Sequence, residues 1–296
     1  MAIICFDFGG TAVKCGCYSQ QVLVDKGVFK TPSSWQEMKS KLKKIYDHYD
    51  CHQTQYGGIE GIAISAPGSV DSSKGVIEGI SAIPYIHHFP IVTELKDWFS
   101  KPVAIENDAN CAALAEMSAG SAKDAQTAAF FIIGSGIGGA ICINRKLVKG
   151  SHLFGGEFGY FLANKTRTVS ETASPVALAR AYATEKKIET AFSGKDLFRL
   201  ADTGNYDAQV KVDQFYETIS RTMHTVSLVI DPEVIVIGGG ISSRKEILKP
   251  LEKRLNELLK ISKAQGLDVS VKLAEFGQDA NLIGAVAHFK ETMSQS

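Results

Sequence analysis

The sequence predicts an α/β protein built from two halves, and three observations lead to this fold class. A glycine-rich turn at residues 6–11 lies between two apolar runs, and a similar turn at residues 134–139 lies between two others. Predicted strands and helices alternate along the chain, which is typical of α/β sheets. The chain has 296 residues, of which 45% are hydrophobic, enough for large cores and two domains. We therefore expect two α/β halves, each opening on a glycine-turn hairpin.

The first half is predicted from its apolar runs and turn residues. Apolar side chains at near-helical spacing predict a helix over residues 34–49. Pro67 and Gly68 end a short buried strand, and a loop-rich stretch then reaches Pro90. In chain order, the other expected elements are strands over 2–6, 12–18, 22–30 and 59–65, a helix over 91–99, a strand over 102–106 and a helix over 108–118.

The second half is predicted in the same way. Its longest helix is expected over residues 207–230, where apolar residues gather on one face and Asp231 with Pro232 ends the helix. A glycine-, polar- and aromatic-rich loop is expected over 149–170. In chain order, the other expected elements are strands over 128–133 and 140–143, helices over 175–187 and after 193, a strand over 233–237, a helix over 245–260, a strand over 269–273 and a helix from about 280.

Composition and charge limit the partners and the location. The formal net charge is zero, so neither nucleic acid nor a membrane surface is expected as the main partner. No apolar run approaches the roughly 20 residues of a membrane-spanning helix, and no signal-like leader precedes the strand expected from Ala2. The six cysteines are scattered, several in apolar runs, which indicates buried free thiols. Cys15 and Cys17 stand one spacer short of a zinc-type CxxC pair. We therefore expect a cytoplasmic protein.

The two glycine turns and a third glycine cluster suggest a nucleotide site. Glycine lets the backbone approach a ligand closely, and successive N–H groups in such turns bind anions. The third cluster, residues 238–240, stands between a predicted strand and a predicted helix, whose N-terminus would carry partial positive charge. Each cluster alone would be read as an ordinary turn. This third cluster is not a Walker A loop, because the chain contains no GxxxxGK[ST], and it does not match GxGxxG, which disfavours a dinucleotide fold. Together the clusters predict ATP in a cleft between the two halves.

Three polar residues flank the first glycine turn. Asp7 ends the first predicted strand, where its carboxylate could hold Mg²⁺ directly or through a water. An Asx-turn cap is the alternative role for this side chain. Thr11 and Lys14 could contact phosphate, although Lys14 is equally well explained as a solvated strand residue. We predict a magnesium-assisted phosphate site at this turn.

Residues 106–110 are the best candidates for catalysis. This polar cluster stands where a buried strand meets a helix N-terminus, a frequent position of active-site groups in α/β sheets. Asp108 as a helix N-cap is the alternative, but that role does not require two asparagines beside it. A carboxylate here would accept the proton of a substrate hydroxyl that attacks a γ-phosphoryl group. The loop over 155–160 adds an acid, Glu157, among glycines, and carboxylates bind sugar hydroxyls well.

These motifs, in this order, resemble the ROK family of sugar kinases and repressors, part of the actin-like ATPase superfamily. The resemblance covers nearly the whole chain. It implies a two-domain actin-like (ribonuclease H-like) α/β fold with ATP and sugar in the interdomain cleft. The first domain would comprise 1–117 and 281–296, and the second 118–280. It also implies a homodimer.

The resemblance assigns roles to individual residues. Asp108 would be the catalytic base, and Asp7 would hold Mg²⁺, directly or through a water. The sugar would contact Gly68, Asn107, Asp108, Glu157 and Glu171. ATP would contact Asp7, Gly9, Gly10, Thr11, Lys14, Gly134, Ser135, Gly136, Gly138, Gly239 and Gly240.

One departure from the family pattern concerns zinc. The family places a histidine after GGExG and a CxCGxxGCxE segment beyond it, which together bind structural zinc. Here Tyr160 stands at the histidine position, and residues 162–170 contain no cysteine. We therefore expect no zinc site. Across this deletion, Glu171 is matched to the acid that closes the segment and touches the sugar near its anomeric end.

The missing segment also bears on the substrate. Zinc-less members with a segment like residues 83–85 look most like β-glucoside kinases, which phosphorylate the 6-hydroxyl of cellobiose-type disaccharides. A shortened loop would open the anomeric side of the sugar pocket and admit an aglycone. A glucokinase, an N-acetylmannosamine kinase and a non-catalytic sugar-sensing regulator remain alternatives. A repressor is not expected, because no residues precede the first strand to form a helix-turn-helix.

Overall fold

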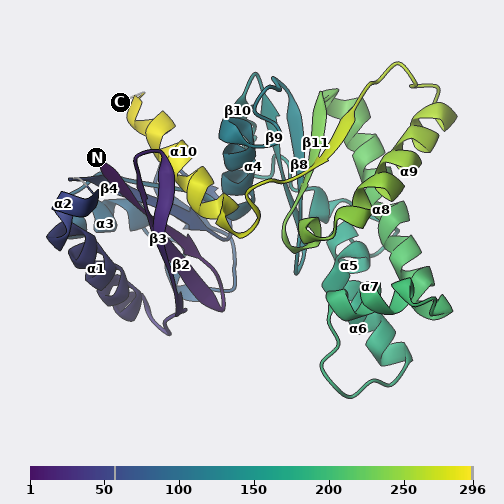
Figure 1. The fold of residues 1–296 in the computed structure, drawn as a ribbon, viewed down its shortest axis with the longest axis horizontal. Helices are drawn as coiled ribbons and strands as arrows, with labels where there is room; N and C mark the ends of the chain where they lie inside the picture. Colours follow the sequence, from purple (N-terminus) through teal and green to yellow (C-terminus); the bar gives the residue numbers. More distant parts are fainter. Residues whose placement is uncertain (57, 295–296) are drawn as a thin grey trace. The chain divides into compact units, whose positions relative to one another are not determined.

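The computed structural model describes residues 1–56 and 58–294 (Figure 1). The chain divides into two compact units. Unit 1 is Met1–Ser118 with Asp279–Ser296, and unit 2 is Ala119–Gln278. Each unit has its own five-stranded sheet and its own hydrophobic core. In the described part of the chain, none of the helices combines the length and the apolar character that a bilayer span requires.

The sheet of unit 1 has the strand order β3-β2-β1-β4-β7. β1 pairs antiparallel with β2 and parallel with β4, and β4 pairs parallel with β7. The strands are β1 (Ala2–Phe8), β2 (Ala12–Ser19), β3 (Val22–Lys30), β4 (Ile59–Ala66) and β7 (Val103–Asn107). The helices are α1 (Trp35–Cys51), α2 (Gln53–Tyr56), α3 (Ile91–Phe99), α4 (Asp108–Ala119) and α10 (Ala280–Ser294). A small hairpin of β5 (Ser69–Asp71) and β6 (Val76–Glu78) and the 3₁₀ turn η1 (Pro84–Ile86) follow β4.

Strand β1 is buried on both faces of the unit 1 sheet. Successive side chains of a strand point to opposite faces, so alternate residues of β1 join different cores. In β1, Ile4 and Phe6 join the core that α1 and α3 complete. Ile3 and Cys5 join a second core with residues of α4 and α10. The contact with α10 is close: a Cβ atom on Gly61 would stand 2.3 Å from Cζ of Phe289. The glycine in β4 thus lets α10 pack directly on the sheet.

The sheet of unit 2 has the strand order β10-β9-β8-β11-β12. β8 pairs antiparallel with β9 and parallel with β11, so the unit repeats the hairpin-plus-parallel pattern of unit 1. The strands are β8 (Ala128–Ile133), β9 (Ile137–Ile143), β10 (Lys146–Leu147), β11 (Val234–Gly238) and β12 (Ser270–Leu273). The helices are α5 (Val169–Ala173), α6 (Pro175–Glu185), α7 (Gly194–Asp202), α8 (Tyr206–Ile230) and α9 (Leu248–Ile261), and the 3₁₀ turns are η2 (Phe158–Tyr160), η3 (Gly240–Ser243), η4 (Lys245–Ile247) and η5 (Gly277–Asp279).

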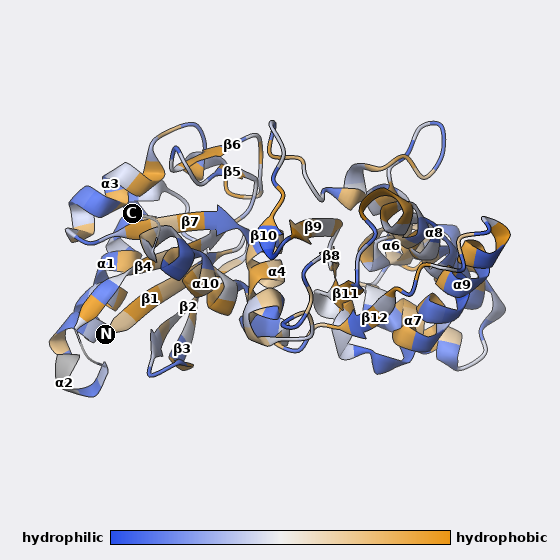
Figure 2. Ribbon diagram, turned by 90° about the horizontal axis from the view of Figure 1, so that it is seen from above, coloured by the Kyte–Doolittle hydropathy of each residue, from blue (hydrophilic) through white to orange (hydrophobic). Residues whose placement is uncertain are grey.

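Hydrophobic residues of the strands and helices of unit 2 form one core, to which α8 contributes Phe215, Ile219 and Met223. Hydrophobic colouring marks β1 and β9, whereas much of α8 and α9 is hydrophilic (Figure 2).

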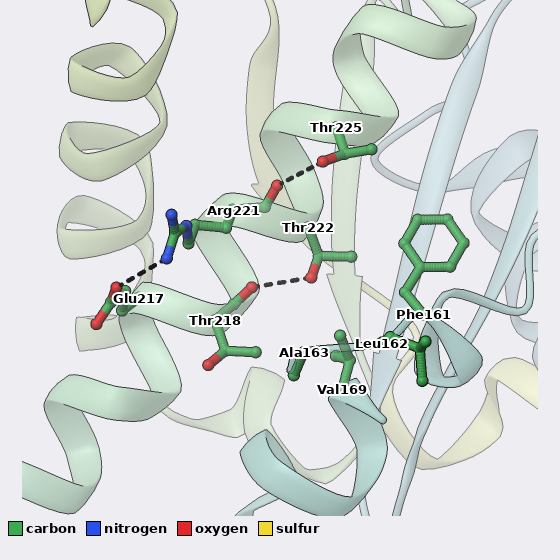
Figure 3. Close-up of a pocket in the computed structure, with 9 residues that line it drawn as sticks. All are labelled: Phe161, Leu162, Ala163, Val169, Glu217, Thr218, Arg221, Thr222 and Thr225. Atoms are coloured by element: carbon green, nitrogen blue, oxygen red, sulfur yellow. Dashed lines mark hydrogen bonds and ion pairs between the residues drawn. The ribbon is translucent and has the colours of Figure 1, made fainter. Parts of the chain in front are cut away.

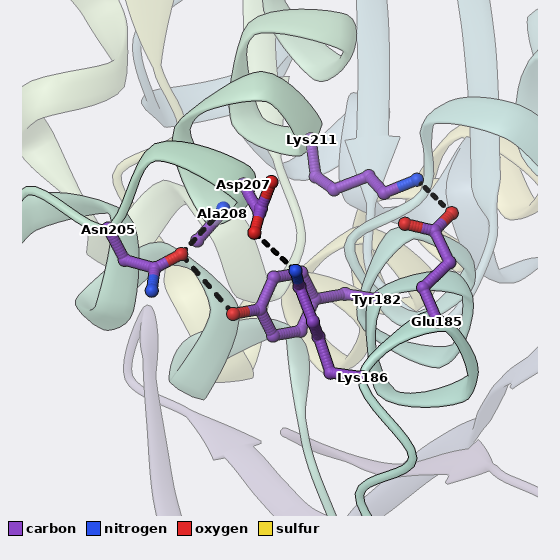
Figure 4. Close-up of polar contacts among 7 residues, drawn as sticks. All are labelled: Tyr182, Glu185, Lys186, Asn205, Asp207, Ala208 and Lys211. Carbon is purple, nitrogen blue, oxygen red and sulfur yellow. Dashed lines mark hydrogen bonds and ion pairs between the residues drawn. The ribbon is translucent and has the colours of Figure 1, made fainter.

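Polar contacts fasten α6 to the start of α8 (Figure 4). Asn205 is the N-cap of α8: its side-chain oxygen accepts the Ala208 N–H at 3.0 Å and the Tyr182 hydroxyl at 3.2 Å. Such a cap stabilises a helix by about 1 kcal/mol. Two ion pairs at the surface join the same helices, Lys186 with Asp207 and Lys211 with Glu185. Exposed ion pairs contribute little, so the cap and the core fix this junction.

Most predicted elements are confirmed, but α2, β10 and α5 were not predicted, and three further details were wrong. The hairpin β5–β6 was expected to be loop. β9 begins at Ile137, so Gly138 and Gly139 lie in a strand and only residues 134–136 form the turn. Helix α9 begins at Leu248, so two 3₁₀ turns rather than an α-helix follow the glycine cluster after β11.

Candidate active site

Three polar residues lie side by side at one edge of the unit 1 sheet. In the parallel register, Asp7 pairs with Ser65 and Ser65 pairs with Glu106. Because β1, β4 and β7 run parallel, their carboxyl ends meet at this edge, where ligands bind in open α/β sheets. The end of β7 changes from hydrophobic to hydrophilic colouring in Figure 2. The sheet thus presents a polar row with acids on both sides.

Asp7 is buried and held by neutral donors. Its Oδ1 accepts the Ser65 hydroxyl at 2.8 Å and the Asn281 Nδ2 at 3.0 Å. Its Oδ2 lies 3.6 Å from Lys14 Nζ. The Asx-turn alternative receives no support from these contacts, because both donors to Oδ1 come from other elements. One carboxylate oxygen is therefore fixed, and the other faces a cation.

Glu106 connects three segments of unit 1. The residue is 1% exposed. Oε1 accepts the Asn107 N–H at 2.8 Å and the Asn110 Nδ2 at 3.0 Å, and Oε2 accepts the Ser72 hydroxyl at 3.2 Å. The carboxylate thus joins the end of β7, the first turn of α4 and the β5–β6 hairpin. The sequence motif contained this residue, but no role was predicted for it.

Asn107 takes the capping role that was considered for Asp108. Its Oδ1 accepts the Asn110 N–H at 3.1 Å, the bond that an N-cap makes three residues into a helix. Its Nδ2 donates to the Gly68 carbonyl at 3.0 Å. The φ angle of Gly68 is +99°, which favours glycine. The structure therefore brings together Asn107, Gly68 and Asp108, three of the predicted sugar contacts.

Asp108 is the first residue of α4 and is partly exposed. Its Oδ1 accepts the Ala109 N–H at 2.8 Å. Burial raises the pKa of Asp108 to about 6; the Ala109 N–H opposes this shift and the negative charge of Asp7 adds to it. A carboxylate with a pKa near neutral suits a general base.

The first predicted phosphate turn is tight. A Cβ atom on Gly9 would stand 2.6 Å from the Ala12 carbonyl oxygen, and one on Gly10 would stand 2.5 Å from the Ala82 Cβ. Both positions thus exclude larger side chains. Thr11 is exposed, and its carbonyl accepts the Thr31 N–H at 3.1 Å.

The second predicted phosphate turn opens unit 2. It is closed by a bond from the Gly134 N–H to the Gly136 carbonyl at 2.9 Å. The Ser170 hydroxyl accepts the Ile137 N–H at 3.0 Å and would lie 2.9 Å from a Cβ atom on Gly136, so α5 supports this turn. Ser135 is at the tip of the turn.

The predicted adenosine motif packs against this turn. Gly239 has a φ angle of +80°, and a Cβ atom there would stand 2.5 Å from the Ile133 carbonyl oxygen. A Cβ on Gly240 would meet no atom of the described residues within 4 Å. The end of β11 and the end of β8 therefore form one surface.

A cavity of about 600 Å³ adjoins this surface within unit 2. Its size is in the range of small-molecule sites. The start of α6, the start of α7 and the residues after β11 form its wall. The lining residues most relevant here are Gly134, Ser135, Phe198, Gly240, Arg244 and Glu246.

Glu157 and Glu171 lie in different parts of unit 2. Glu157 follows Gly155 and Gly156, which pack so closely on β9 and the preceding chain that added Cβ atoms would clash. Glu171 forms a capping box with Thr168: its Oε2 accepts the Thr168 N–H at 2.8 Å, and the Thr168 hydroxyl accepts the Glu171 N–H. The carboxylate of Glu171 thus has a structural function at the start of α5, which sequence matching did not reveal.

A second cavity of unit 2, about 390 Å³, lies over the middle of α8 (Figure 3). The loop residues Phe161 and Leu162 line one side, and Thr218, Arg221 and Thr222 of α8 line the other. None of the predicted site residues belongs to its lining. The residues that the structure describes contain no group of three or more His, Cys, Asp or Glu placed to hold a metal ion.

The sequence model of the ROK family matches residues 3–292 of this chain. The chain belongs to the ROK family. This ROK protein is 32% identical to a β-glucoside kinase of Listeria monocytogenes, over 98% of this chain and 97% of that protein. It is 30% identical to a β-glucoside kinase of Klebsiella pneumoniae, with the same coverage.

Solved structures agree with this family assignment. A ROK family protein from Streptococcus pneumoniae in complex with sucrose aligns over 100% of both chains, with a TM-score of 0.89 and 31% identity. The predicted ROK resemblance and the two-domain actin-like α/β fold are therefore confirmed.

Proposed function

We propose that this ROK protein transfers the γ-phosphoryl group of ATP to the 6-hydroxyl of a β-glucoside such as cellobiose. Family membership and full-length similarity to β-glucoside kinases identify the broader class, a sugar phosphotransferase. The observation that carries the chemistry is Asp108, a base with a raised pKa that stands beside Asn107 and Gly68.

The sugar is proposed to bind against the polar end of β7. Gly68 and Asn110 orient the amide of Asn107 and each take up one of its hydrogen bonds. An amide has two donor hydrogens and two acceptor lone pairs, so capacity for a sugar hydroxyl remains. Asp108 accepts the proton of the 6-hydroxyl as that oxygen bonds to the γ-phosphorus, and the bond from phosphorus to the β–γ bridging oxygen breaks to release ADP. Glu157 and Glu171 are proposed as further sugar contacts, although Glu171 would have to serve the sugar and the α5 cap together.

The nucleotide is proposed to use both glycine turns and the 600 Å³ cavity. The first domain, 1–117 and 281–296, supplies the turn at Gly9 and Gly10. The second, 118–280, supplies the turn at Gly134 and the adenosine surface at Gly240. Gly134, Ser135 and Gly240 all line the cavity, which supports the contribution of the second domain.

Asp7 fits a role in binding Mg²⁺. Its buried carboxylate has one oxygen fixed by Ser65 and Asn281 and a second oxygen near Lys14. Mg²⁺ often keeps several waters and takes only one or two carboxylates beside substrate phosphates. When bound, it would neutralise charge that builds up between the phosphates. The donor set of a single carboxylate oxygen is consistent with contact through water.

The β-glucoside preference rests on three supports. The two β-glucoside kinases are similar over their full lengths. Residues 162–170 contain no zinc-binding cysteines. The Streptococcus protein was solved with sucrose, a disaccharide whose anomeric carbons are both in the glycosidic bond. These supports favour a pocket open on the anomeric side. We also propose a cytoplasmic location, since ATP is a cytoplasmic substrate. The family resemblance adds the proposal of a homodimer.

The test is ADP release from ATP and Mg²⁺ across cellobiose, gentiobiose, an aryl β-glucoside, glucose, fructose and N-acetylmannosamine. A preference for β-glucosides is expected. A preference for glucose or N-acetylmannosamine would keep the kinase and overturn the open pocket. No ADP with any sugar, while ATP still binds, would favour the sugar-sensing regulator.

A further inference from the structure

Arg244 occupies a fixed position in the wall of the 600 Å³ cavity. It follows η3, directly after the glycine cluster of β11, and its side chain is 25% exposed. Its Nη2 lies 2.5 Å from Asp202 Oδ1. Its Cζ lies 5.3 Å from the centroid of the Phe198 ring, which also lines the cavity. Two residues of α7 thus hold the guanidinium by its edge and by its face, and Tyr216 of α8 also interacts with it.

One polar atom of this side chain is left without a partner. Nε of Arg244 is buried and has no hydrogen-bond partner among the described residues. Buried donors are almost always satisfied, so a donor that is not satisfied requires an explanation. A base stacked on the face of the guanidinium would leave this in-plane donor unsatisfied, so Nε does not itself indicate a ligand.

The charges around Arg244 indicate which part of a nucleotide it would meet. Its positive charge is already paired with Asp202. Glu246 lines the same cavity and adds a second negative charge near Arg244, whereas Lys195 at the start of α7 adds a positive charge to the lining. Two carboxylates disfavour a phosphate at this place. A planar guanidinium, in contrast, stacks well on a flat base.

We propose that Arg244 is a nucleotide-binding residue whose guanidinium, held by Asp202 and Phe198, forms the platform for the purine base. This inference rests on the proposed function, which places a nucleotide in the cavity. Because stacking uses the face of the base rather than its edge, the platform serves adenine and guanine alike.

The chain offers a matched control. Arg254 of α9 is also paired with an aspartate, Asp213, and its Cζ lies 5.7 Å from the Tyr216 ring centroid. Its side chain is 32% exposed, close to the 25% of Arg244. Arg254 is not among the residues that line the cavity. Replacing it removes the same kind of ion pair and aromatic contact at a residue that does not line the cavity, although its aromatic partner Tyr216 also interacts with Arg244.

The experiment measures binding of adenosine and of inorganic tripolyphosphate by calorimetry, in the full chain and without sugar. Arg244→Ala and Arg244→Met should each weaken adenosine binding by about tenfold, the order of one lost base stack. Tripolyphosphate binding should not change, and Arg254→Ala should leave both ligands unaffected. Arg244→Met keeps the aliphatic stem, so its result stands if the alanine variant folds poorly.

In turnover, the Arg244 variants should raise KM for ATP and GTP by similar factors, with kcat and the sugar KM unchanged. Weaker tripolyphosphate binding with unchanged adenosine binding would overturn the proposal in favour of a phosphate contact. Unchanged binding of both ligands would also overturn it. If adenosine binds through Arg244 but no sugar is phosphorylated, the proposed function fails and this inference stands.

Discussion

Asp108 allows the proposed function to be tested at the scale of a single residue. As its carboxylate must be ionised to accept a proton, and its pKa is raised to about 6, kcat/KM should fall as the pH drops below about 6. Asp108→Asn should lower kcat by orders of magnitude and leave ATP affinity nearly unchanged. Initial rates between pH 5 and 8.5, with ATP binding measured in parallel, check both statements. Near-normal turnover in the variant would remove Asp108 from this role.

The same residue should lower the stability of the protein. Because the folded pKa lies above the unfolded value, the stability linked to Asp108 is complete below about pH 4 and is lost as the pH rises through about 6. Asp108→Asn removes this loss, so at pH 7.5 the variant should be more stable by about 1–3 kcal/mol. Urea unfolding at pH 7.5 and pH 4 provides the comparison. A gain that is as large at pH 4 as at pH 7.5 would contradict the explanation.

Glu106 should act through the residues it holds. Glu106→Ala removes the carboxylate that accepts hydrogen bonds from Asn107, Asn110 and Ser72. A loss of this kind lowers the free energy of unfolding by about 1–3 kcal/mol. Glu106→Gln keeps an oxygen for both asparagines and should be milder. We expect the alanine variant to raise the sugar KM more than the ATP KM, and steady-state kinetics with each substrate varied in turn will show this. Equal effects of both variants on both KM values would rule out a positioning role.

At the scale of elements, the spacing of apolar residues predicted those helices and strands whose formation depends on the local sequence. The hairpins, α1, α3, α8 and α10 follow from apolar spacing and turn residues, and their positions are confirmed. The β5–β6 hairpin was not predicted, because strands of three residues give no periodic signal. The roles of Ser65 and Asn281 beside Asp7 depend on strand register and on α10, which lies more than two hundred residues away in the sequence. Such long-range partners leave no local pattern.

The glycine cluster after β11 allows a matched test of an element. Gly239→Ala places a Cβ 2.5 Å from the Ile133 carbonyl oxygen at a φ angle of +80°, so it should destabilise the protein by about 1–3 kcal/mol. Gly240→Ala meets open space at its Cβ and should change the free energy of unfolding by less than about 1 kcal/mol. Thermal unfolding of both variants separates strain from mere loss of a glycine. Equal losses would show that the close approach to β8 is not the cause.

At the scale of the whole molecule, the sequence predicted the family because its motifs occur together and in order along the chain. Family matching assigned Glu171 to the sugar, whereas the structure shows it capping α5. Arg244 was missed, since an arginine between two short turns has no signature until Asp202 and Phe198 are placed around it. Motifs thus predict roles that recur across a family, and tertiary contacts reveal the supporting residues.

The absence of the zinc segment leads to a prediction for the complete protein. In a zinc-dependent relative, the metal would connect the GGExG loop to the segment beyond it. Here that loop is held by glycines packed on β9 and by the aromatic stack of Phe158 on Phe131, at 4.7 Å between ring centroids. Activity and thermal stability should therefore survive prolonged treatment with a zinc-selective chelator. EDTA should abolish turnover, and added Mg²⁺ alone should restore it. Elemental analysis of the purified protein should find less than one zinc per chain. A loss of activity that only Zn²⁺ reverses would contradict this prediction and show that the chain binds zinc through residues outside the family pattern.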